Sequence, residues 1–278
     1  MIFQIPYHSD SNVKNLYYKI IGIPHIGTRI RGNTVFKVLN LKKGSKILDI
    51  GAGSSMFSFE TMKRGYNVIR CDLLLGITRE EIMKYEQMFI KAGFDCPFVQ
   101  ASGTSLPLKD ESFDGVLCAD VLEHIPDEES AFKEIRRVLK KDGVLIASTP
   151  TTGFHKGKFK GFFRFIHKNL FLAKLNIWDE LHLYPERMMK EKGHLREYSL
   201  EMWKERCEKY GFKLEDYEWQ YKFFGAFFVE LSHTFKVFGT MKWYQGLIFL
   251  LCYPITKIDN ILPIKGNGIA IRAKKEER

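Results

Sequence analysis

Two aspartates and a glycine turn are the residues of this sequence whose types and spacing most clearly predict chemistry. The stretch 47–55 reads ILDIGAGSS, an apolar strand that ends near Asp49 and turns through Gly51 and Gly53 into a helix. Glycines let the backbone approach a ligand closely, and the N–H groups of the following helix point at its polar end. Asp72 stands 21 residues after Gly51, where a carboxylate can accept both hydroxyls of a ribose. The pattern predicts a site for a small ligand that contains a ribose.

A dinucleotide such as NAD or FAD is the competing ligand for this turn, because those cofactors use G-x-G-x-x-G at the same place. The third glycine of that pattern is missing, and Met56 stands in its position. Asp49 would also repel a pyrophosphate, whereas it suits a ligand with a cationic or amino group. The carboxylate therefore favours a ligand with a positive end.

The elements that must position these residues follow an α/β pattern. Between positions 45 and 150, short apolar or β-branched runs alternate with amphipathic stretches, which is typical of a parallel sheet covered by helices. The predicted strands are 46–50, 67–71, 97–100, 113–118 and 143–148, and the predicted helices are 55–63, 79–92 and 127–139, the last ending at the Lys-Asp-Gly of 141–143. After an interruption, the pattern predicts a helix at 200–210 that stops at Gly211, and strands at 213–221 and 268–273.

Four ordered motifs together resemble a known family. They are LDIGAGSS, the acidic Asp72, the segment 101–127 (ASGTSLPLKDESFDGVLCADVLEHIPD) and the segment 132–150 (FKEIRRVLKKDGVLIASTP). They resemble the class I S-adenosylmethionine (SAM) dependent methyltransferases, in the branch that acts on small molecules and lipids. The resemblance covers roughly residues 40–150, with weaker support from 194–220 and 266–274. Ordered motifs at the right separations are far more specific than any one of them. The resemblance implies a Rossmann-like, seven-stranded, mostly parallel sheet with helices on both faces, an antiparallel last strand and SAM as cofactor.

The resemblance also implies roles for individual residues. Asp49 would face the ammonium of SAM, Asp72 would bind its ribose, and Asp120 would lie beside the methionine sulfur. Where the family often has an acid for the adenine amino group, this sequence has Ser102, whose hydroxyl can accept one hydrogen bond. The predicted cofactor-binding residues are Asp49, Gly51, Ala52, Gly53, Asp72, Leu73, Ser102, Gly103, Thr104, Ala119 and Asp120.

Three histidines are the catalytic candidates. Methyl transfer from a sulfonium is an in-line displacement, to which proximity alone can contribute roughly 7–11 kcal/mol. For a hydroxyl acceptor, which we favour, a nearby base would add a factor of ~10²–10⁴. His194 begins the segment HLREYS, which resembles one that covers the active site in this branch, and His182 and His124 are the other candidates. The alternative is that each of them only packs or caps.

Metal chemistry and secretion are not expected. The five cysteines are scattered, with no CxxC pair and no histidine at metal-ligand spacing, which predicts reduced core cysteines and no metal site. The first residues lack a charged and an apolar region of a secretory signal. The longest apolar run, 246–255, is about half of the ~20 residues that span a bilayer. The sequence therefore predicts a cytoplasmic protein.

Charge and aromatic residues point to a partner. The net charge is +10. The segment 153–196 contains ten Lys and Arg but four Asp and Glu, and its basic residues are interleaved with phenylalanines. Such a mixture suits the inner face of an anionic membrane, so we expect peripheral association and a small-molecule, lipid or lipid-linked acceptor. The alternatives are a water-soluble metabolite under a lid made by the insertions, an RNA substrate, for which no binding module is visible, or a non-catalytic SAM-binding protein that serves interactions.

On this interpretation the chain divides into six segments. They are an N-terminal helical arm at 1–44, a SAM-binding core at 45–150, a basic and aromatic cap insertion at 151–198, a return to the core at 199–220, an apolar insertion at 221–265, and the last strand with a charged tail at 266–278. The sequence leaves the acceptor molecule, the acceptor atom and the oligomeric state open.

Overall fold

One seven-stranded sheet is the centre of the computed structural model, which describes residues 26–74, 78–151, 193–234 and 243–277 together with Phe159, Gly161, Phe162 and Phe165. The strand order is β3-β2-β1-β4-β5-β7-β6. The strands are β1 (Lys46–Ile50), β2 (Asn67–Asp72), β3 (Phe98–Gln100), β4 (Phe113–Ala119), β5 (Leu139–Pro150), β6 (Phe212–Gln220) and β7 (Gly268–Lys275).

Only the last strand of the chain runs against the others. β1 pairs in parallel with β2 and β4, and parallel pairing continues to β3 on one side and β5 on the other. β7 is antiparallel to both of its neighbours, β5 and β6. This confirms the predicted sheet. β2 and β3 lie on one side of β1, and β4 and β5 lie on the other. At such a switch point a crevice is expected beyond the carboxyl ends of β1 and β4.

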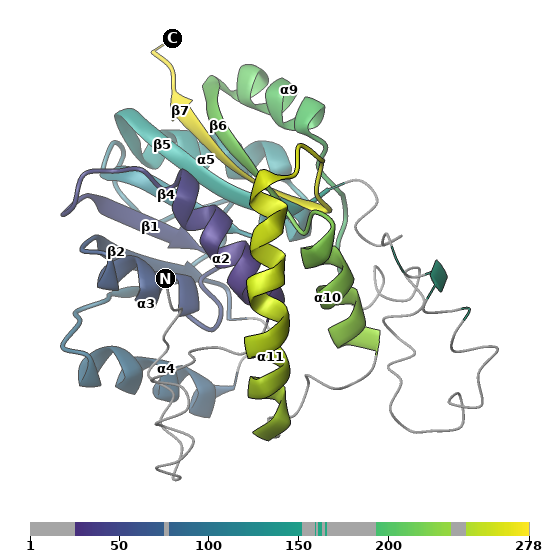
Figure 1. Cartoon of the computed structure of the whole chain (residues 1–278). Coiled ribbons are helices and arrows are strands. Elements are labelled where there is room, and N and C mark those ends of the chain that lie inside the picture. Colours follow the sequence, from purple (N-terminus) through teal and green to yellow (C-terminus); the bar gives the residue numbers. More distant parts are fainter. Residues whose placement is uncertain are drawn as a thin grey trace.

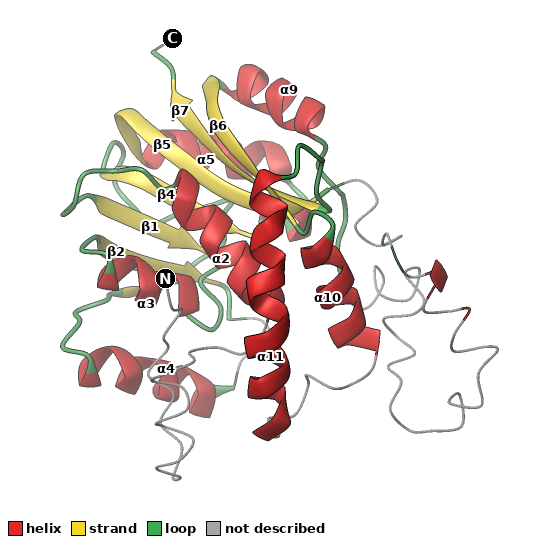
Figure 2. Cartoon of the chain, viewed as in Figure 1, coloured by secondary structure: helices red, strands yellow, loops and turns green. Residues whose placement is uncertain are grey.

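Helices cover both faces of the sheet, as Figures 1 and 2 show. They are α2 (Ile26–Val38), α3 (Met56–Lys63), α4 (Arg79–Lys91), α5 (Glu128–Val138), α9 (Leu200–Tyr210), α10 (Phe224–Thr234) and α11 (Trp243–Thr256), with the 3₁₀ turns η1 (Leu122–His124) and η3 (Lys257–Ile261). On one face, Phe132 of α5 and Trp203 of α9 are fully buried in the largest core cluster. On the other face, Val35 and Phe36 of α2 pack with Phe57 of α3.

The predicted helix and strand positions hold within a few residues, with one error. The predicted helix at 127–139 ends at Val138, and the Lys-Asp-Gly of 141–143 lies inside β5 rather than in a helix cap. Leu139 is already extended and pairs with Phe113 of β4. Asp142, not Gly143, adopts the positive φ of 59°. Pairing of β5 with β4 thus outweighs the helix-ending tendency of the Lys-Asp-Gly sequence. Gly211, in contrast, ends α9 as predicted, at a φ of 75°.

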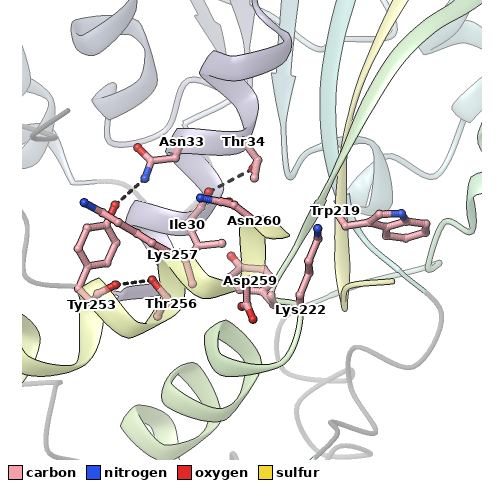
Figure 3. A pocket seen from close by; sticks show the side chains of 11 residues that line it. Ile30, Asn33, Thr34, Trp219, Lys222, Tyr253, Thr256, Lys257, Asp259 and Asn260 are labelled. Carbon is pink, nitrogen blue, oxygen red and sulfur yellow. Dashed lines mark hydrogen bonds between the residues drawn. The ribbon is translucent and has the colours of Figure 1, made fainter. Parts of the chain in front are cut away.

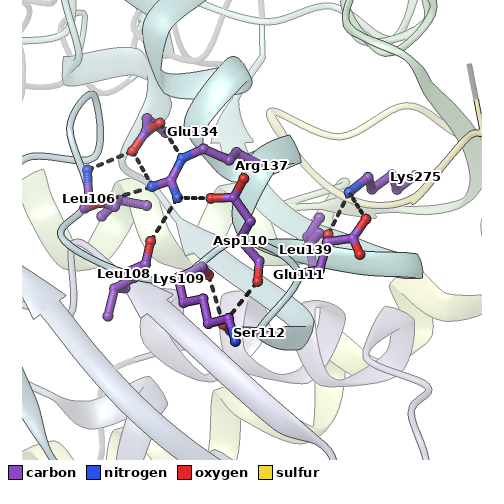
Figure 4. A network of polar contacts seen from close by, with 10 residues as sticks. All are labelled: Leu106, Leu108, Lys109, Asp110, Glu111, Ser112, Glu134, Arg137, Leu139 and Lys275. Carbon is purple, nitrogen blue, oxygen red and sulfur yellow. Dashed lines mark hydrogen bonds and ion pairs between the residues drawn. The ribbon is translucent and has the colours of Figure 1, made fainter.

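An arginine of α5 fixes the loop that leads from β3 to β4 (Figure 4). Arg137 donates to the backbone carbonyls of Leu106 and Leu108 at 2.9 and 2.7 Å. Its guanidinium also forms ion pairs with Asp110 and Glu134. Because this loop directly follows residues 102–104, the network holds one wall of the crevice in place.

The described residues leave part of the predicted organisation untested. His182 and most of the predicted cap insertion at 151–198 lie outside them, as do residues 1–25 of the predicted arm. Residues 193–199 return to the core, since the N–H of Tyr198 donates to Pro150 O at 3.0 Å. Within the described ranges, no helix combines the length and the apolar character needed to cross a membrane.

Candidate active site

A cavity of about 840 Å³ opens beyond the carboxyl ends of β1, β2 and β4. Its volume is in the range of cofactor and substrate sites. The lining residues are Ile50, Gly51, Asp72, Leu73, Ala101, Ser102, Gly103, Thr104, Asp120, Val121, His124, Ile125, Pro126 and Asp127. Eight of the predicted site residues therefore meet around one cavity, whereas Asp49, Ala52, Gly53 and Ala119 are not part of its lining.

The glycine turn after β1 is held in a conformation that needs glycine. Gly51 has φ 69°, and a Cβ atom there would lie 2.4 Å from Cγ2 of Val121. The N–H groups of Gly51 and Ala52 both donate to Cys71 O, at 2.8 and 3.1 Å. Ser55 is also left-handed, at φ 58°, so a serine occupies a glycine-like conformation at the start of α3. A side chain at this position would have to displace Val121, which also lines the cavity.

Asp72 joins this turn to the end of β2. One oxygen of its carboxylate accepts from the N–H of Gly53 at 2.8 Å, and the other accepts from the N–H of Leu74 at 2.6 Å. The side chain thereby fixes the turn and lies on the wall of the cavity. We call Gly51, Asp72, Ser102 and Gly103 the glycine side of the cavity.

Asp49 lies behind the glycine turn rather than on the wall. Its side chain is 2% exposed and accepts a hydrogen bond from Ser58 Oγ. Burial raises the pKa of this carboxyl to about 7, and the bond from Ser58 opposes the rise. Its predicted contact with an ammonium group stays a prediction.

Ser102 lies on the cavity wall, and its hydroxyl is engaged within the wall. Its Oγ is 2.7 Å from Oγ1 of Thr104 and accepts from the N–H of Thr104 at 3.2 Å. A Cβ at the adjacent Gly103 would approach Ile50 Cγ2 to 3.1 Å. The predicted adenine contact through Ser102 stays a prediction.

Asp120 faces the cavity from the end of β4 and is held by protein donors. It forms an ion pair with Arg31 of α2 and accepts from Ser148 Oγ at 2.6 Å. Its φ is 56°, in the left-handed region. Sequence reasoning missed Arg31, because no local pattern links a helix of the N-terminal arm to a strand end 89 residues later. The position of Asp120 beside a cofactor sulfur stays a prediction.

Glu123, next along the chain, is a buried carboxyl without a partner. It is 0% exposed, and neither of its carboxylate oxygens has a hydrogen-bond partner among the described residues. Burial, and then the nearby charge of Asp120, raise its pKa to about 9. The sequence analysis assigned no role to Glu123. The one indication in the sequence was an acidic residue beside the apolar Leu122 in a short turn.

The segment that begins at Gly193 covers the η1 turn. Nδ1 of His124 lies 3.2 Å from Gly193 O, and the N–H of Leu195 donates to Glu123 O at 2.8 Å. The rings of His124 and His194 meet edge to face with centroids 4.6 Å apart. The structure thus brings together two of the three predicted catalytic histidines. We call Asp120, Glu123, His124 and His194 the histidine side; Asp120 and His124 line the cavity, and Glu123 and His194 adjoin them without being part of its lining.

The histidine side also contains a set of atoms that sequence spacing could not reveal. One ligand atom from each of Glu123, His124 and His194 lies within 4.8 Å of the others. Since His194 comes some seventy positions after His124 in the chain, no short motif links them. The sequence-based expectation of no metal site was drawn from cysteine and histidine spacing alone.

The glycine side fits SAM, the cofactor that the family resemblance implies. Gly51 and Asp72 both lie on the cavity wall, and Asp72 stands at the distance along the chain from the glycine turn that is typical of a ribose ligand. Acidic side chains on and behind this wall suit a ligand with positive groups better than a pyrophosphate.

Comparison with known proteins gives the same assignment for the core. A family model described as a methyltransferase domain matches residues 48–147. A demethylmenaquinone methyltransferase from Streptomyces griseus is 32% identical over 118 residues, or 42% of this chain and 48% of the relative. A ubiquinone biosynthesis O-methyltransferase from Haemophilus ducreyi is 32% identical over 130 residues, or 45% of this chain and 53% of that relative. The chain spans about half the length of the curated relatives it matches.

Solved structures share the fold over most of the chain. A SAM-dependent methyltransferase from Thermotoga maritima is similar with a TM-score of 0.51 at 19% identity, covering 95% of this chain and 96% of that one. The cyclase SpnF gives a TM-score of 0.53 at 17% identity, covering 90% of this chain and 81% of that one. Because a cyclase shares it, the fold by itself does not fix the reaction. The family model identifies residues 48–147 as a methyltransferase domain, and the sheet order and the motifs are those of the class I, SAM-dependent type.

Proposed function

We propose that this protein transfers the methyl group of SAM to a hydroxyl oxygen of an apolar small molecule, a lipid or lipid-linked compound, at a membrane surface. The observation that carries the proposal is a SAM-sized cavity with two chemically different sides in a chain similar to two quinone-pathway methyltransferases. The names of those relatives support a quinol or a related phenol as the acceptor class.

The reaction requires positioning more than new chemistry. SAM supplies a methyl group on a positively charged sulfur; the sulfur–carbon bond breaks as the carbon–oxygen bond forms, and the hydroxyl proton leaves. The glycine side would hold the cofactor, which leaves the histidine side to receive the acceptor. Because a carbonyl oxygen only accepts hydrogen bonds, the contact with Gly193 O assigns the proton of His124 to Nδ1. Its Nε2 can then accept the hydroxyl proton, and His194 beside it is the second candidate base.

Exposed apolar side chains at the end of α11 support the membrane part of the proposal. Leu251, Ile255 and Ile258 are 65%, 37% and 42% exposed, and their spacing puts them on one helical face. Ile261, the last residue of η3 and 80% exposed, continues this surface, and the exposed Lys257 adds a cation. An apolar stripe with cations beside it suits insertion at the boundary between acyl chains and anionic head groups.

Polar contacts tie α11 and η3 to the rest of the domain, and Figure 3 shows the one between Asn33 and Tyr253. Asp259 of η3 accepts from the N–H groups of Phe223, Phe224 and Gly225 at 3.1, 2.9 and 2.7 Å, which ties η3 to the start of α10. The hydroxyl of Tyr253 accepts from Asn33 of α2 at 2.5 Å. The cavity between these elements has a volume of about 60 Å³, which is too small for a lipid. A lipid would therefore contact the exposed stripe and not this cavity.

A sedimentation experiment tests the membrane part. The full-length protein is spun with vesicles of neutral and of anionic phospholipid, and binding to the anionic ones is expected. The double variant Leu251→Glu/Ile258→Glu should remain in the supernatant. Ile90→Glu, on the 72% exposed Ile90 of α4, is the matched control and should still sediment. Equal sedimentation of all three proteins, or of none, would refute the membrane proposal and favour a water-soluble acceptor.

Methyl transfer itself is tested with SAM labelled on its methyl group and reduced demethylmenaquinone or simpler catechols and phenols as acceptors. Label is expected in an ether of the acceptor, and mass spectrometry identifies the methylated atom. Label on ring carbon would correct the acceptor atom. If SAM binds and none of these acceptors is labelled, the quinol and phenol class is wrong.

A further inference from the structure

We propose that Glu123, His124 and His194 form a binding site for one divalent metal ion of the zinc class. The site goes beyond methyl transfer, since ion binding can be measured without any acceptor. Its role toward the acceptor rests on the proposed function. The inference follows from four features of the histidine side of the cavity.

The first feature is the set of ligand types. One carboxylate oxygen and one nitrogen from each of two imidazoles lie within 4.8 Å of one another. Two histidines and one glutamate are a ligand set of zinc enzymes that keep a fourth position open. Ligand atoms around a tetrahedral zinc ion lie about 3.4 Å apart, given metal–ligand bonds of about 2.1 Å. His194 lies in a loop, outside any helix or strand, so a shift of roughly 1 Å can close the site.

The second feature is the hydrogen bond that orients His124. Its Nδ1–H donates to Gly193 O at 3.2 Å, which leaves the lone pair on Nε2. Metal-bound histidines almost always donate their other ring N–H to a carbonyl or carboxylate, because this fixes the tautomer and the ring. The same backbone segment carries His194, so one contact orders two ligands.

The third feature is the state of Glu123. Its carboxyl is 0% exposed, and neither oxygen has a hydrogen-bond partner among the described residues. A buried carboxyl without a donor is costly, and a bound cation is one of the few groups that would satisfy it. Polar atoms in this situation call for an explanation such as an ion.

The fourth feature is that the neighbouring cations are used elsewhere. Arg31 forms its ion pair with Asp120. Arg196 donates to the backbone carbonyls of Leu122 and Ile125 at 3.2 and 2.7 Å. Both arginines face Glu123 at longer range, but neither bonds to it in the part of the chain that the structure describes. The carboxyl is thus left for a ligand that comes from outside.

An ion in this position would lie where the acceptor is expected. His124 is part of the cavity wall, beside Asp120 and Val121. The open fourth position could hold the acceptor oxygen and stabilise its ionised form, as zinc does for bound water. In that state both imidazoles are ligands, and the hydroxyl proton passes to water instead of to His124 or His194.

The test titrates Co²⁺ into full-length protein that has been treated with a chelator. Co²⁺ takes the same ligands as Zn²⁺ and reports a tetrahedral environment through its visible absorption. We expect one Co²⁺ per chain with an intense, tetrahedral-type spectrum that Zn²⁺ abolishes by displacement. Glu123→Gln and His194→Ala should each weaken binding by more than the ~10–100-fold typical of losing an outer-shell partner.

Two controls match these variants. Asp127→Asn removes a negative charge from the same cavity wall and keeps a residue that caps α5 equally well, and His233→Ala removes a histidine of α10. Both should bind Co²⁺ as the parent does. Circular dichroism verifies that every variant is folded, and Glu123→Gln preserves the shape of the side chain.

The outcomes separate this site from the proposed function. A weak octahedral spectrum, or a stoichiometric site that survives both Glu123→Gln and His194→Ala, would overturn the metal proposal. Calorimetry with SAM on the same preparation is the second measurement. SAM binding without Co²⁺ binding overturns the metal site alone, whereas Co²⁺ binding without SAM binding overturns the proposed function and leaves the metal site standing.

Discussion

The two sides of the cavity differ in how their carboxyl groups are satisfied. On and behind the glycine side, Asp72 accepts from two backbone N–H groups and Asp49 accepts from Ser58. On the histidine side, Asp120 is paired with Arg31, but Glu123 has no hydrogen-bond partner among the described residues. The glycine side is complete within the protein, whereas the histidine side leaves one buried group to be satisfied by a ligand.

The two sides also differ in where their parts come from. The glycine side is built from the ends of β1, β2 and β3 and the turns that follow them, within some sixty residues of sequence. The histidine side combines α2, the end of β4 and the segment at 193–199. A cofactor that a whole family shares can be bound by residues close together in sequence, at the ends of neighbouring strands. Acceptors differ between family members, and loops that differ between them can bind these acceptors.

The largest expected effect concerns Asp49. Its pKa in the folded protein is raised to about 7, so the folded state keeps a proton that the unfolded chain releases near pH 4. The contribution of protonated Asp49 to the free energy of unfolding is therefore fully present below about pH 4. It is lost as the pH rises to about 7, by up to about 4 kcal/mol. Denaturant unfolding without SAM should show this slope. Asp49→Asn should reduce this slope and leave the part that comes from the raised pKa of Glu123, whereas Asn at the exposed Asp95 should leave the slope unchanged. An equal slope in both variants would mean that Asp49 is ionised in the folded state.

The next effect concerns the backbone of the glycine side. In Gly51→Ala, the new Cβ would lie 2.4 Å from Val121 Cγ2 at a φ of 69°. The turn or Val121 must therefore shift on the cavity wall, and SAM binding should weaken roughly tenfold to hundredfold. Gly93→Ala has a similar φ of 70° with nothing within 4 Å. It should share the backbone strain and bind SAM as the parent does. If Gly51→Ala bound SAM normally, the cofactor would not approach this turn.

The smallest effect tests the adenine contact. Ser102→Asp introduces the acid that the family often has at this position, and a charge-assisted hydrogen bond to an amino group should tighten SAM binding by about tenfold at most. Ser105→Asp, three residues further along the same loop, is the control. Calorimetry that finds weaker binding in Ser102→Asp would place the adenine elsewhere on the wall.

Sequence patterns named the residues of the glycine side, and on the histidine side they named Asp120, His124 and His194 but missed Arg31 and Glu123. A strand, a glycine turn and Asp72 are signals that act within a few residues or between adjacent strands, and the resulting pattern predicted both the sheet and the cavity wall. Arg31 could not be found in this way, because its partner Asp120 lies 89 residues further along the chain. Glu123 stands out only in the folded protein, where its carboxylate has no hydrogen-bond partner among the described residues. The helix end predicted at 141–143 failed in the same way, since Leu139 pairs with Phe113 of a neighbouring strand.

Calorimetric titration of SAM into three full-length proteins tests the central claim, that a self-contained cofactor side is separate from a histidine side that serves the acceptor. The proteins are the parent, Gly51→Ala and Glu123→Gln. The account predicts micromolar binding by the parent, weaker binding by Gly51→Ala and nearly unchanged binding by Glu123→Gln. Absence of SAM binding by the parent, or equal loss in both variants, would contradict it.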